Sequence, residues 1–263
     1  MNGVNVTDLL GTIVAATRTA VASRERERPL GTTAGSRLPD GAAFVRALSS
    51  SPEPRIIAEC KRRSPSRGIL RQAYDPTAHA RAYEAGGAAA VSVLTEPTFF
   101  DGDPAHLEAV GEAVSIPVLR KDFIVTEYQV HEAAALGADA VLLIAGALAD
   151  DELRRLHELA RSIGLAALVE VHDEPELARA LDAGARIVGV NSRNLRTLQV
   201  DIGITERLSQ RIPDGVVAVA ESGIRSSGDI RRLAACGYDA FLVGERLIVE
   251  DDPGMALREL RSS

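Results

Sequence analysis

Short apolar segments recur along this chain at regular intervals, and their number constrains the fold more than any other feature. Each segment is five to seven residues long and nearly continuous in Val, Ile, Leu and Ala, which is typical of parallel strands covered on both faces. Several follow a Gly-Ala step, where glycine suits the left-handed residue that closes a helix. The eight segments are residues 55–61, 89–94, 117–121, 139–144, 165–171, 186–191, 215–220 and 239–243.

The stretches between these segments have the periodicity and the start signals of helices. In residues 150–163, for example, one helical face carries Leu153, Leu156, Leu159 and Ala160. Helix N-caps are expected at Asp75, Asp103, Thr126 and Asp173, and a proline stands in the first turn after three of them. The pattern therefore predicts strands and helices in alternation.

Eight strands that alternate with helices indicate an α/β fold with a parallel sheet. Eight strands can close into a barrel, and 263 residues is an ordinary length for such a barrel, which typically has about 250. An open, doubly wound sheet is the alternative, but no glycine-rich dinucleotide fingerprint follows the first strand. We predict a single (β/α)8 TIM barrel with an N-terminal helical extension.

The first 45 residues precede this repeat. Residues 6–24 have helical character, residues 31–41 are rich in turn residues, and residues 42–48 have the pattern of a second short helix. We expect residues 1–45 to form a helical appendage packed on or near the barrel, with a partly ordered tail as the alternative. Residues 46–263 are expected to form the catalytic barrel domain.

The composition disfavours several classes of partner. A formal charge of −7 and the absence of Trp argue against nucleic-acid and membrane-surface binding. The longest apolar run is about half of a membrane span, and the N-terminus lacks a signal-peptide pattern, so a cytoplasmic protein is expected.

Cys60 and Cys236 are expected to be buried, reduced thiols. The five histidines share no ligand spacing, so we expect solvated or packed side chains and no metal; no cofactor is expected either.

Charged residues stand at the C-terminal ends of several predicted strands. Glu59 and Lys61 are two residues apart and share a face with Ile57, whereas Cys60 points to the opposite layer. If Ile57 faces the barrel axis, the pair lies at the barrel mouth, where a charge costs less than between sheet and helices. A structural ion pair could explain any one such residue, but a set at matching strand ends predicts a catalytic site. The set consists of Glu59, Lys61, Lys121, Glu170, Asn191, Arg193 and Glu221.

The last two strands are followed by glycine-containing turns. Ser222 and Gly223 come just before a helix expected to begin near residues 226–227, and Gly244 and Glu245 precede another short helix. Backbone N–H groups at helix starts suit a phosphate, and the loops after strands seven and eight commonly hold one in such barrels. These turns therefore predict a phosphate site.

Six segments, in this order, closely resemble the indole-3-glycerol phosphate synthase family. They are AECKRRSPSRG (58–68), SVLTEPTFFDG (92–102), PVLRKDFIVTEYQVHEAAALGADAVLLI (117–144), LVEVHDEPELARAL (168–181), GVNSRNLRTLQVD (189–201) and AESGIRSSGDI (220–230). The resemblance runs from about residue 40 to the end, with a family-like helical appendage before it.

This resemblance implies ring closure of 1-(2-carboxyphenylamino)-1-deoxyribulose 5-phosphate, with loss of CO2 and water, to indole-3-glycerol phosphate. Lys121 matches the family's acid for ring closure. Dehydration falls to Glu170, Lys61 and Glu59, and the division of work among them stays open. The implied binding residues are Ser64 near the anthranilate carboxylate, Asn191 and Arg193 at the aromatic end, Glu221 at the sugar hydroxyls, Phe99 and Phe123 beside the ring, and Ser222, Gly223, Gly244 and Glu245 at the phosphate.

Two positions depart from the family pattern. Cys60 replaces a branched apolar residue, which is harmless if the side chain faces away from the pocket. Glu245 stands where many members have Ser. A carboxylate beside a phosphate is unfavourable unless it turns out to solvent and leaves only its N–H at the site.

Other barrel functions are alternatives. Phosphoribosylanthranilate isomerase would need a Cys–Asp acid–base pair at strand ends, and no partner for Cys60 is evident. A Schiff-base aldolase could use Lys61 or Lys121, and a non-catalytic barrel could bind a sugar phosphate. The expected partner is a small anionic sugar phosphate. A monomer or weak homo-oligomer is expected, and contact with other tryptophan-pathway enzymes stays open.

Overall fold

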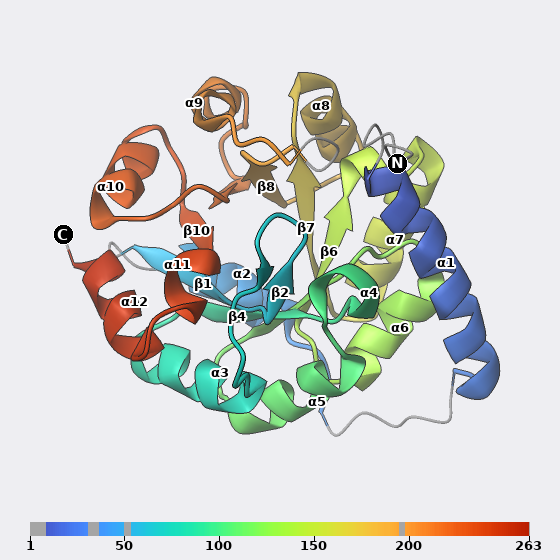
Figure 1. The fold of residues 1–263 in the computed structure, drawn as a ribbon. Helices are drawn as coiled ribbons and strands as arrows, with labels where there is room; N and C mark the ends of the chain where they lie inside the picture. Colours follow the sequence, from blue (N-terminus) through green and yellow to red (C-terminus); the bar gives the residue numbers. More distant parts are fainter. Residues whose placement is uncertain (1–8, 31–36, 50–53, 195–197, 263) are drawn as a thin grey trace, which may run out of the picture.

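Eight parallel strands close into one barrel surrounded by helices (Figure 1). The computed structural model describes residues 9–30, 37–49, 54–194 and 198–262. Each predicted apolar segment coincides with a strand to within a few residues, so the predicted TIM barrel is confirmed. In the order of their pairing around the barrel, the strands are β1 (Arg55–Cys60), β10 (Ala240–Val243), β9 (Val217–Glu221), β8 (Ile187–Asn191), β7 (Ala166–Val171), β6 (Ala140–Ile144), β5 (Val118–Lys121) and β4 (Ala90–Leu94).

Helices on the outside of the barrel connect the strands, and the last two helices follow the last strand. They are α3 (Pro76–Ala85), α4 (Pro97–Phe100), α5 (Pro104–Ala113), α6 (Glu127–Ala135), the 3-10 helix η1 (Ala145–Ala147), α7 (Asp150–Ser162), α8 (Glu174–Asp182), α9 (Ile202–Ser209), α10 (Ser227–Ala235), α11 (Glu245–Ile248) and α12 (Pro253–Arg261). The side chains of Asp75, Asp103, Thr126 and Asp173 accept hydrogen bonds from first-turn N–H groups of α3, α5, α6 and α8. These four predicted N-caps are therefore confirmed.

Side chains alternate between two apolar cores, one inside the barrel and one between strands and helices. Ile57 lies in the inner core with Leu119, Leu168 and Val219, as the alternation of strand residues predicts. Cys60 belongs to the outer core and is fully buried, and this burial raises the pKa of its thiol well above the ordinary value. Cys236 is only partly buried, so the expectation that both thiols are buried was wrong for this residue.

Two helices precede the first strand, α1 (Leu9–Glu27) and α2 (Gly41–Ser49). Gly41 donates its backbone N–H to Gly164 O at 2.9 Å, just before β7, and Phe44 of α2 is fully buried in the inner core. Helix α2 therefore covers the end of the barrel opposite the strand carboxyl ends. Helix α1 packs beside α6 (Figure 1). Both predicted helices are confirmed where the structure describes them; residues 6–8 and 31–36 lie outside that part. The boundary at residue 45 stays a prediction, and it falls within α2.

A small antiparallel hairpin that the sequence did not suggest follows β1. It consists of β2 (Arg63–Ser64) and β3 (Gly68–Ile69). Figure 1 shows it in front of the barrel mouth. The hairpin therefore places the loop of residues 65–67 beside the strand carboxyl ends.

Candidate active site

A cavity of about 840 Å³ lies at the carboxyl ends of the strands. Phe100 lines it where the sequence suggested Phe99, which is not among the lining residues of the described chain, so that placement was wrong. All other residues predicted for the site line the cavity: Glu59, Lys61, Ser64, Lys121, Phe123, Glu170, Asn191, Arg193, Glu221, Ser222, Gly223, Gly244 and Glu245.

Lys121, at the end of β5, is held between two carboxylates. Its Nζ lies 2.8 Å from Glu170 Oε2 and 3.2 Å from Glu221 Oε2. The register makes Gly189 the neighbour of Glu170 on β8, between the strands that carry the two carboxylates. A Cβ at Gly189 would collide with Glu221 Oε1. Glycine at this position therefore allows the two carboxylates to converge on one ammonium.

These three groups shift one another's proton affinity. Burial alone would lower the pKa of Lys121, but Glu170, Glu221 and Glu59 raise it above its usual range. Burial would raise the pKa of Glu170, but Lys121 and His172 lower it below its usual range. Burial, supported by Glu170 and opposed by Lys121, raises the pKa of Glu221 to about 8. The site thus holds a protonated amine, an ionised carboxylate and a carboxyl group that is mostly protonated at neutral pH.

Glu59 and Lys61 form the second charged pair of the cavity, as the β1 sequence predicted. Lys61 Nζ donates a hydrogen bond to Glu59 Oε2. A Cβ at Gly244 would collide with this same Oε2 and lie 3.0 Å from Lys61 Nζ. Gly244 therefore permits the pair to lie against the start of α11.

The turn after β9 has an unusual backbone. Ser222 has φ of +66° and Gly223 of +76°, so two successive residues are left-handed, and one of them is not glycine. Such a conformation costs free energy and is concentrated at functional sites. This turn and Gly244 both border the cavity, where the sequence predicted a phosphate.

The carboxylate of Glu245 is turned toward arginines. Its Oε1 lies 3.3 Å from Arg193 Nη2 and its Oε2 lies 3.5 Å from Arg67 Nε. Arg67 comes from the unpredicted hairpin loop and also lines the cavity, as do Arg225 and Arg246. Two cations therefore compensate the charge of the Glu245 carboxylate at the site, an arrangement that the sequence analysis did not include.

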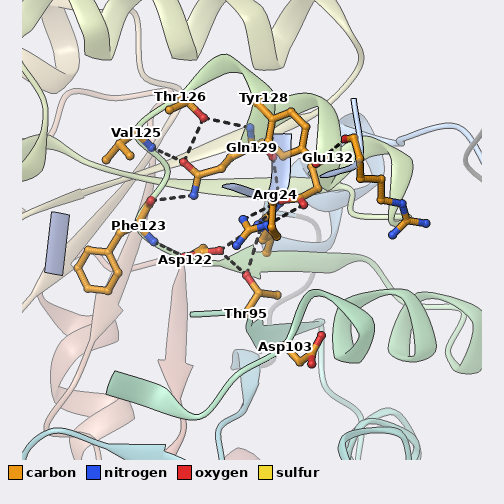
Figure 2. Close-up of polar contacts among 12 residues, drawn as sticks. Arg24, Thr95, Asp103, Asp122, Phe123, Val125, Thr126, Tyr128, Gln129 and Glu132 are labelled. Carbon is orange, nitrogen blue, oxygen red and sulfur yellow. Dashed lines mark hydrogen bonds and ion pairs between the residues drawn. The ribbon is translucent and has the colours of Figure 1, made fainter. Parts of the chain in front are cut away.

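A buried ionic network lies behind β5 and supports the segment that carries Lys121. Arg120 is fully buried, and its Nη2 lies 3.0 Å from Asp122 Oδ2 and 2.8 Å from Glu132 Oε2. Arg120 Nε also donates to Thr95 Oγ1 at 3.1 Å. Glu132 in turn accepts hydrogen bonds of 3.1 Å from Nε and Nη2 of Arg24 on α1 (Figure 2). The network therefore joins β5, α6 and the N-terminal helix.

The same network fixes the turn between β5 and α6. Asp122 Oδ1 accepts from the N–H of Phe123 at 2.8 Å. Gln129 donates to Phe123 O at 3.0 Å and accepts from the N–H of Val125 at 2.9 Å (Figure 2). These bonds hold the backbone on the carboxyl side of Lys121, so that Lys121 and Phe123 both face the cavity.

Neither a metal cluster nor a membrane-spanning helix is found in the part of the chain that the structure describes. No three or more His, Cys, Asp or Glu side chains of these residues gather as metal ligands. None of the described helices combines the length and the apolar character required to cross a bilayer.

Solved structures with this fold include proteins of distant sequence. A thiamine phosphate pyrophosphorylase from Pyrococcus furiosus superimposes with a TM-score of 0.62 at 19% identity, covering 82% of this chain and 96% of that one. KGPDC from Streptococcus mutans has a TM-score of 0.62 at 12% identity, covering 79% of this chain and 95% of that one. At such identities the similarity shows the barrel fold alone.

Sequence comparisons are much more specific. A family model described as indole-3-glycerol phosphate synthase matches residues 10–260. An indole-3-glycerol phosphate synthase from Parafrankia sp. is 52% identical over 250 residues, which cover 94% of this chain and 93% of that protein. One from Chromobacterium violaceum is 45% identical over 261 residues, which cover 97% of this chain and 98% of that protein. The chain therefore belongs to the indole-3-glycerol phosphate synthase family.

Proposed function

We propose that this chain is a carboxy-lyase of tryptophan biosynthesis that converts 1-(2-carboxyphenylamino)-1-deoxyribulose 5-phosphate to indole-3-glycerol phosphate, CO2 and water. The observation that carries the proposal is the position of Lys121. Its ammonium lies between Glu170 and Glu221 in a cavity that also borders the turns suited to a phosphate. A barrel that only bound a sugar phosphate would not require three buried ionisable groups at one point.

Ring closure joins the aromatic carbon that bears the carboxylate to the ribulose carbonyl carbon. As this bond forms, the carbonyl oxygen gains negative charge, and Lys121 Nζ donates a proton to it. The raised pKa of Lys121 keeps the amine protonated before the substrate enters. The carboxylate then leaves as CO2, and its bonding electrons restore the aromatic ring.

Dehydration completes the reaction. The new hydroxyl leaves as water after protonation, and a base removes a proton from the neighbouring ring CH2, the former C1 of the ribulose, which gives the indole double bond. Glu170, Lys61 and Glu59 supply these proton transfers between them. Their carboxylates and ammonium face the same cavity as Lys121, so the intermediate can react without leaving.

The remaining lining residues bind the substrate. Phe100 and Phe123, with ring centroids 6.1 Å apart, form an apolar wall for the aromatic ring. The remaining assignments are Ser64, Asn191 and Arg193 at the anthranilate end, Glu221 at the sugar hydroxyls, and Ser222, Gly223, Gly244 and the N–H of Glu245 at the phosphate.

The direct test is an activity assay with purified protein and the carboxyphenylamino deoxyribulose phosphate. We expect indole fluorescence to appear with release of one CO2 per indole formed. A Schiff-base aldolase would instead form an adduct that borohydride traps on Lys61 or Lys121. Turnover without an indole product, or a trapped adduct, would contradict the proposed reaction.

Inorganic phosphate is expected to compete with the substrate. A phosphate ion at the turns after β9 and β10 would raise KM in proportion to its concentration and leave kcat unchanged. Steady-state rates at several millimolar phosphate concentrations, at constant ionic strength, measure this effect. Unchanged KM across that range would count against the phosphate site.

Replacing Glu245 with Ser is expected to strengthen that inhibition. The substitution removes a carboxylate that repels phosphate and frees Arg193 and Arg67 to attract it. We expect phosphate to bind about three- to tenfold more tightly, equivalent to about 0.7–1.4 kcal/mol. Glu158→Ser, the same change at an exposed position of α7, should leave the inhibition constant unchanged. Equal inhibition constants in Glu245→Ser and wild type would show that the carboxylate has no influence on the phosphate.

The cellular setting also belongs to this proposal. A biosynthetic enzyme acting on a phosphorylated metabolite is expected in the cytoplasm. A monomeric or weakly oligomeric state, and contacts with other tryptophan-pathway enzymes, stay predictions that analytical ultracentrifugation can test.

A further inference from the structure

His172 lies directly behind Glu170, and the chemistry proposed above makes no use of it. The residue follows β7, and only 12% of its side chain is exposed. Its Nε2 lies 3.3 Å from Glu170 Oε1. The other oxygen of that carboxylate, Oε2, is the one that contacts Lys121. The two oxygens of Glu170 thus have different neighbours, an imidazole on one side and the ammonium of Lys121 on the other.

The imidazole is itself fixed from its far side. His172 Nδ1 lies 3.0 Å from Glu176 Oε2, and the backbone N–H of His172 donates to the same oxygen at 2.8 Å. Glu176 is in the first turn of α8, where Asp173 accepts from its N–H at 2.8 Å. A Cβ at Gly146 would collide with Glu176 Oε1, so glycine there lets this carboxylate pack closely. Glu176 therefore cannot move without disturbing the N-terminus of α8.

The contact between His172 and Glu170 is an ion pair and not an aligned hydrogen bond. In the described chain, neither Nε2 of His172 nor Oε1 of Glu170 has a hydrogen-bond partner. Both atoms are buried, and a buried carboxylate oxygen that faces nothing would be costly. A protonated imidazole satisfies it through charge and proximity. Charges thus alternate along a line of four residues, from Lys121 through Glu170 and His172 to Glu176.

We propose that His172 is a positioning residue: as an imidazolium fixed by Glu176, it holds one oxygen of Glu170 so that the other faces Lys121. The groups that face His172 are the carboxylates of Glu170 and Glu176, and Lys121 and Glu221 face Glu170 from the other side. Burial would lower the pKa of His172, but the two carboxylates raise it to about 10. The cation therefore persists through the neutral range and helps to keep Glu170 ionised.

The kinetic consequences of this inference rest on the proposed function. They differ between His172→Asn and His172→Gln. In His172→Asn the amide can replace Nδ1 toward Glu176 but cannot reach Glu170, so kcat should fall by about 10- to 10²-fold with KM changed little. His172→Gln places an uncharged donor near the position of Nε2, so it should recover part of that loss. In both variants the acidic limb of the kcat–pH profile should move to higher pH, because Glu170 loses a cation that lowers its pKa.

A matched control separates this role from ordinary packing. His157 on α7 is also largely enclosed, with 7% of the residue exposed, and lies outside the cavity lining. Since burial lowers its pKa, it is neutral at pH 7. His157→Asn should lower stability without moving the pH profile. If His172→Asn changed kcat no more than His157→Asn does, or left the acidic limb in place, the positioning role would be wrong.

Histidine NMR tests the same inference without any turnover. In protein labelled on its five histidines, one imidazole should stay protonated well above pH 8, and its signal should be absent from His172→Asn. Glu176→Gln should lower the midpoint of that signal by about one unit or more, since one of its two carboxylates is removed. A His172 signal that titrates near the ordinary histidine value of 6.5 in wild type would overturn the inference, whatever activity the protein has.

Discussion

Replacing Lys121 with Ala is expected to reduce kcat by about 10²-fold or more, within the range of a positioned general acid. The variant has no group at the end of β5 that can protonate the carbonyl oxygen during ring closure. Glu170 and Glu221 would remain without their cation and would share a proton, since two adjacent buried carboxylates do not both stay ionised. Single-turnover rates of indole formation measure the effect, and circular dichroism verifies that the barrel is folded.

Lys121→Arg separates charge from proton donation. Arginine keeps a cation near Glu170 and Glu221, but its planar guanidinium cannot place an N–H at the position of the Lys121 Nζ. We expect the variant to be folded and to remain slow in the chemical step. A kcat near wild type in Lys121→Ala would remove the acid role from this residue. Full activity in Lys121→Arg would show that the positive charge alone is sufficient.

Replacing Arg120 with Met should lower the free energy of unfolding by about 3–5 kcal/mol, the largest stability effect that we predict. The guanidinium is completely buried, and its removal leaves Asp122 facing the outer core without a cation. Glu132 keeps Arg24 but loses its closer partner. Urea denaturation at pH 7 measures the loss.

Arg155→Met provides the control for a lost ion pair. Arg155 contacts Glu127 at 3.0 Å, but both side chains are more than half exposed, so less than about 1 kcal/mol is expected. If Arg120→Met cost no more than Arg155→Met, the network behind β5 would not support the segment that carries Lys121.

The barrel could be predicted because strands buried on both faces have a recognisable sequence pattern. Runs such as residues 140–144 are apolar throughout, since one face packs inside the barrel and the other against helices. The two-residue alternation of side chains then extends to the strand ends. This alternation alone correctly predicts that Glu59, Lys121 and Glu170 share one cavity.

The errors occur where this alternation stops. Phe99 and Phe100 lie beyond β4 in the short helix α4, whose N-terminus is fixed by Glu96, and strand periodicity no longer decides which ring faces the cavity. The sequence analysis also could not predict contacts between residues that are distant in the chain, such as the ion pair of Glu245 with Arg67. Leu9 and Ile13 of α1 line the cavity, yet nothing in their local sequence indicates that contact.

The contact of His172 with Glu170 was not predicted from the sequence for a different reason. Histidines without metal spacing are ordinarily solvated or packed, and that interpretation fits all five equally well. The available signal is its distance of two residues from Glu170, which places both side chains on the same side of an extended segment. Arg120 and Asp122 give a similar signal, since they flank Lys121 and must face the opposite layer.

A crystal structure of the protein with indole-3-glycerol phosphate would most directly test whether the strand ends form a single catalytic centre. The phosphate should lie within about 3.2 Å of the backbone nitrogens of Gly223 and Gly244, with the indole ring against Phe123 and near Lys121. Product bound elsewhere on the surface, with Lys121, Glu170 and Glu221 still paired in an empty cavity, would contradict the proposed chemistry.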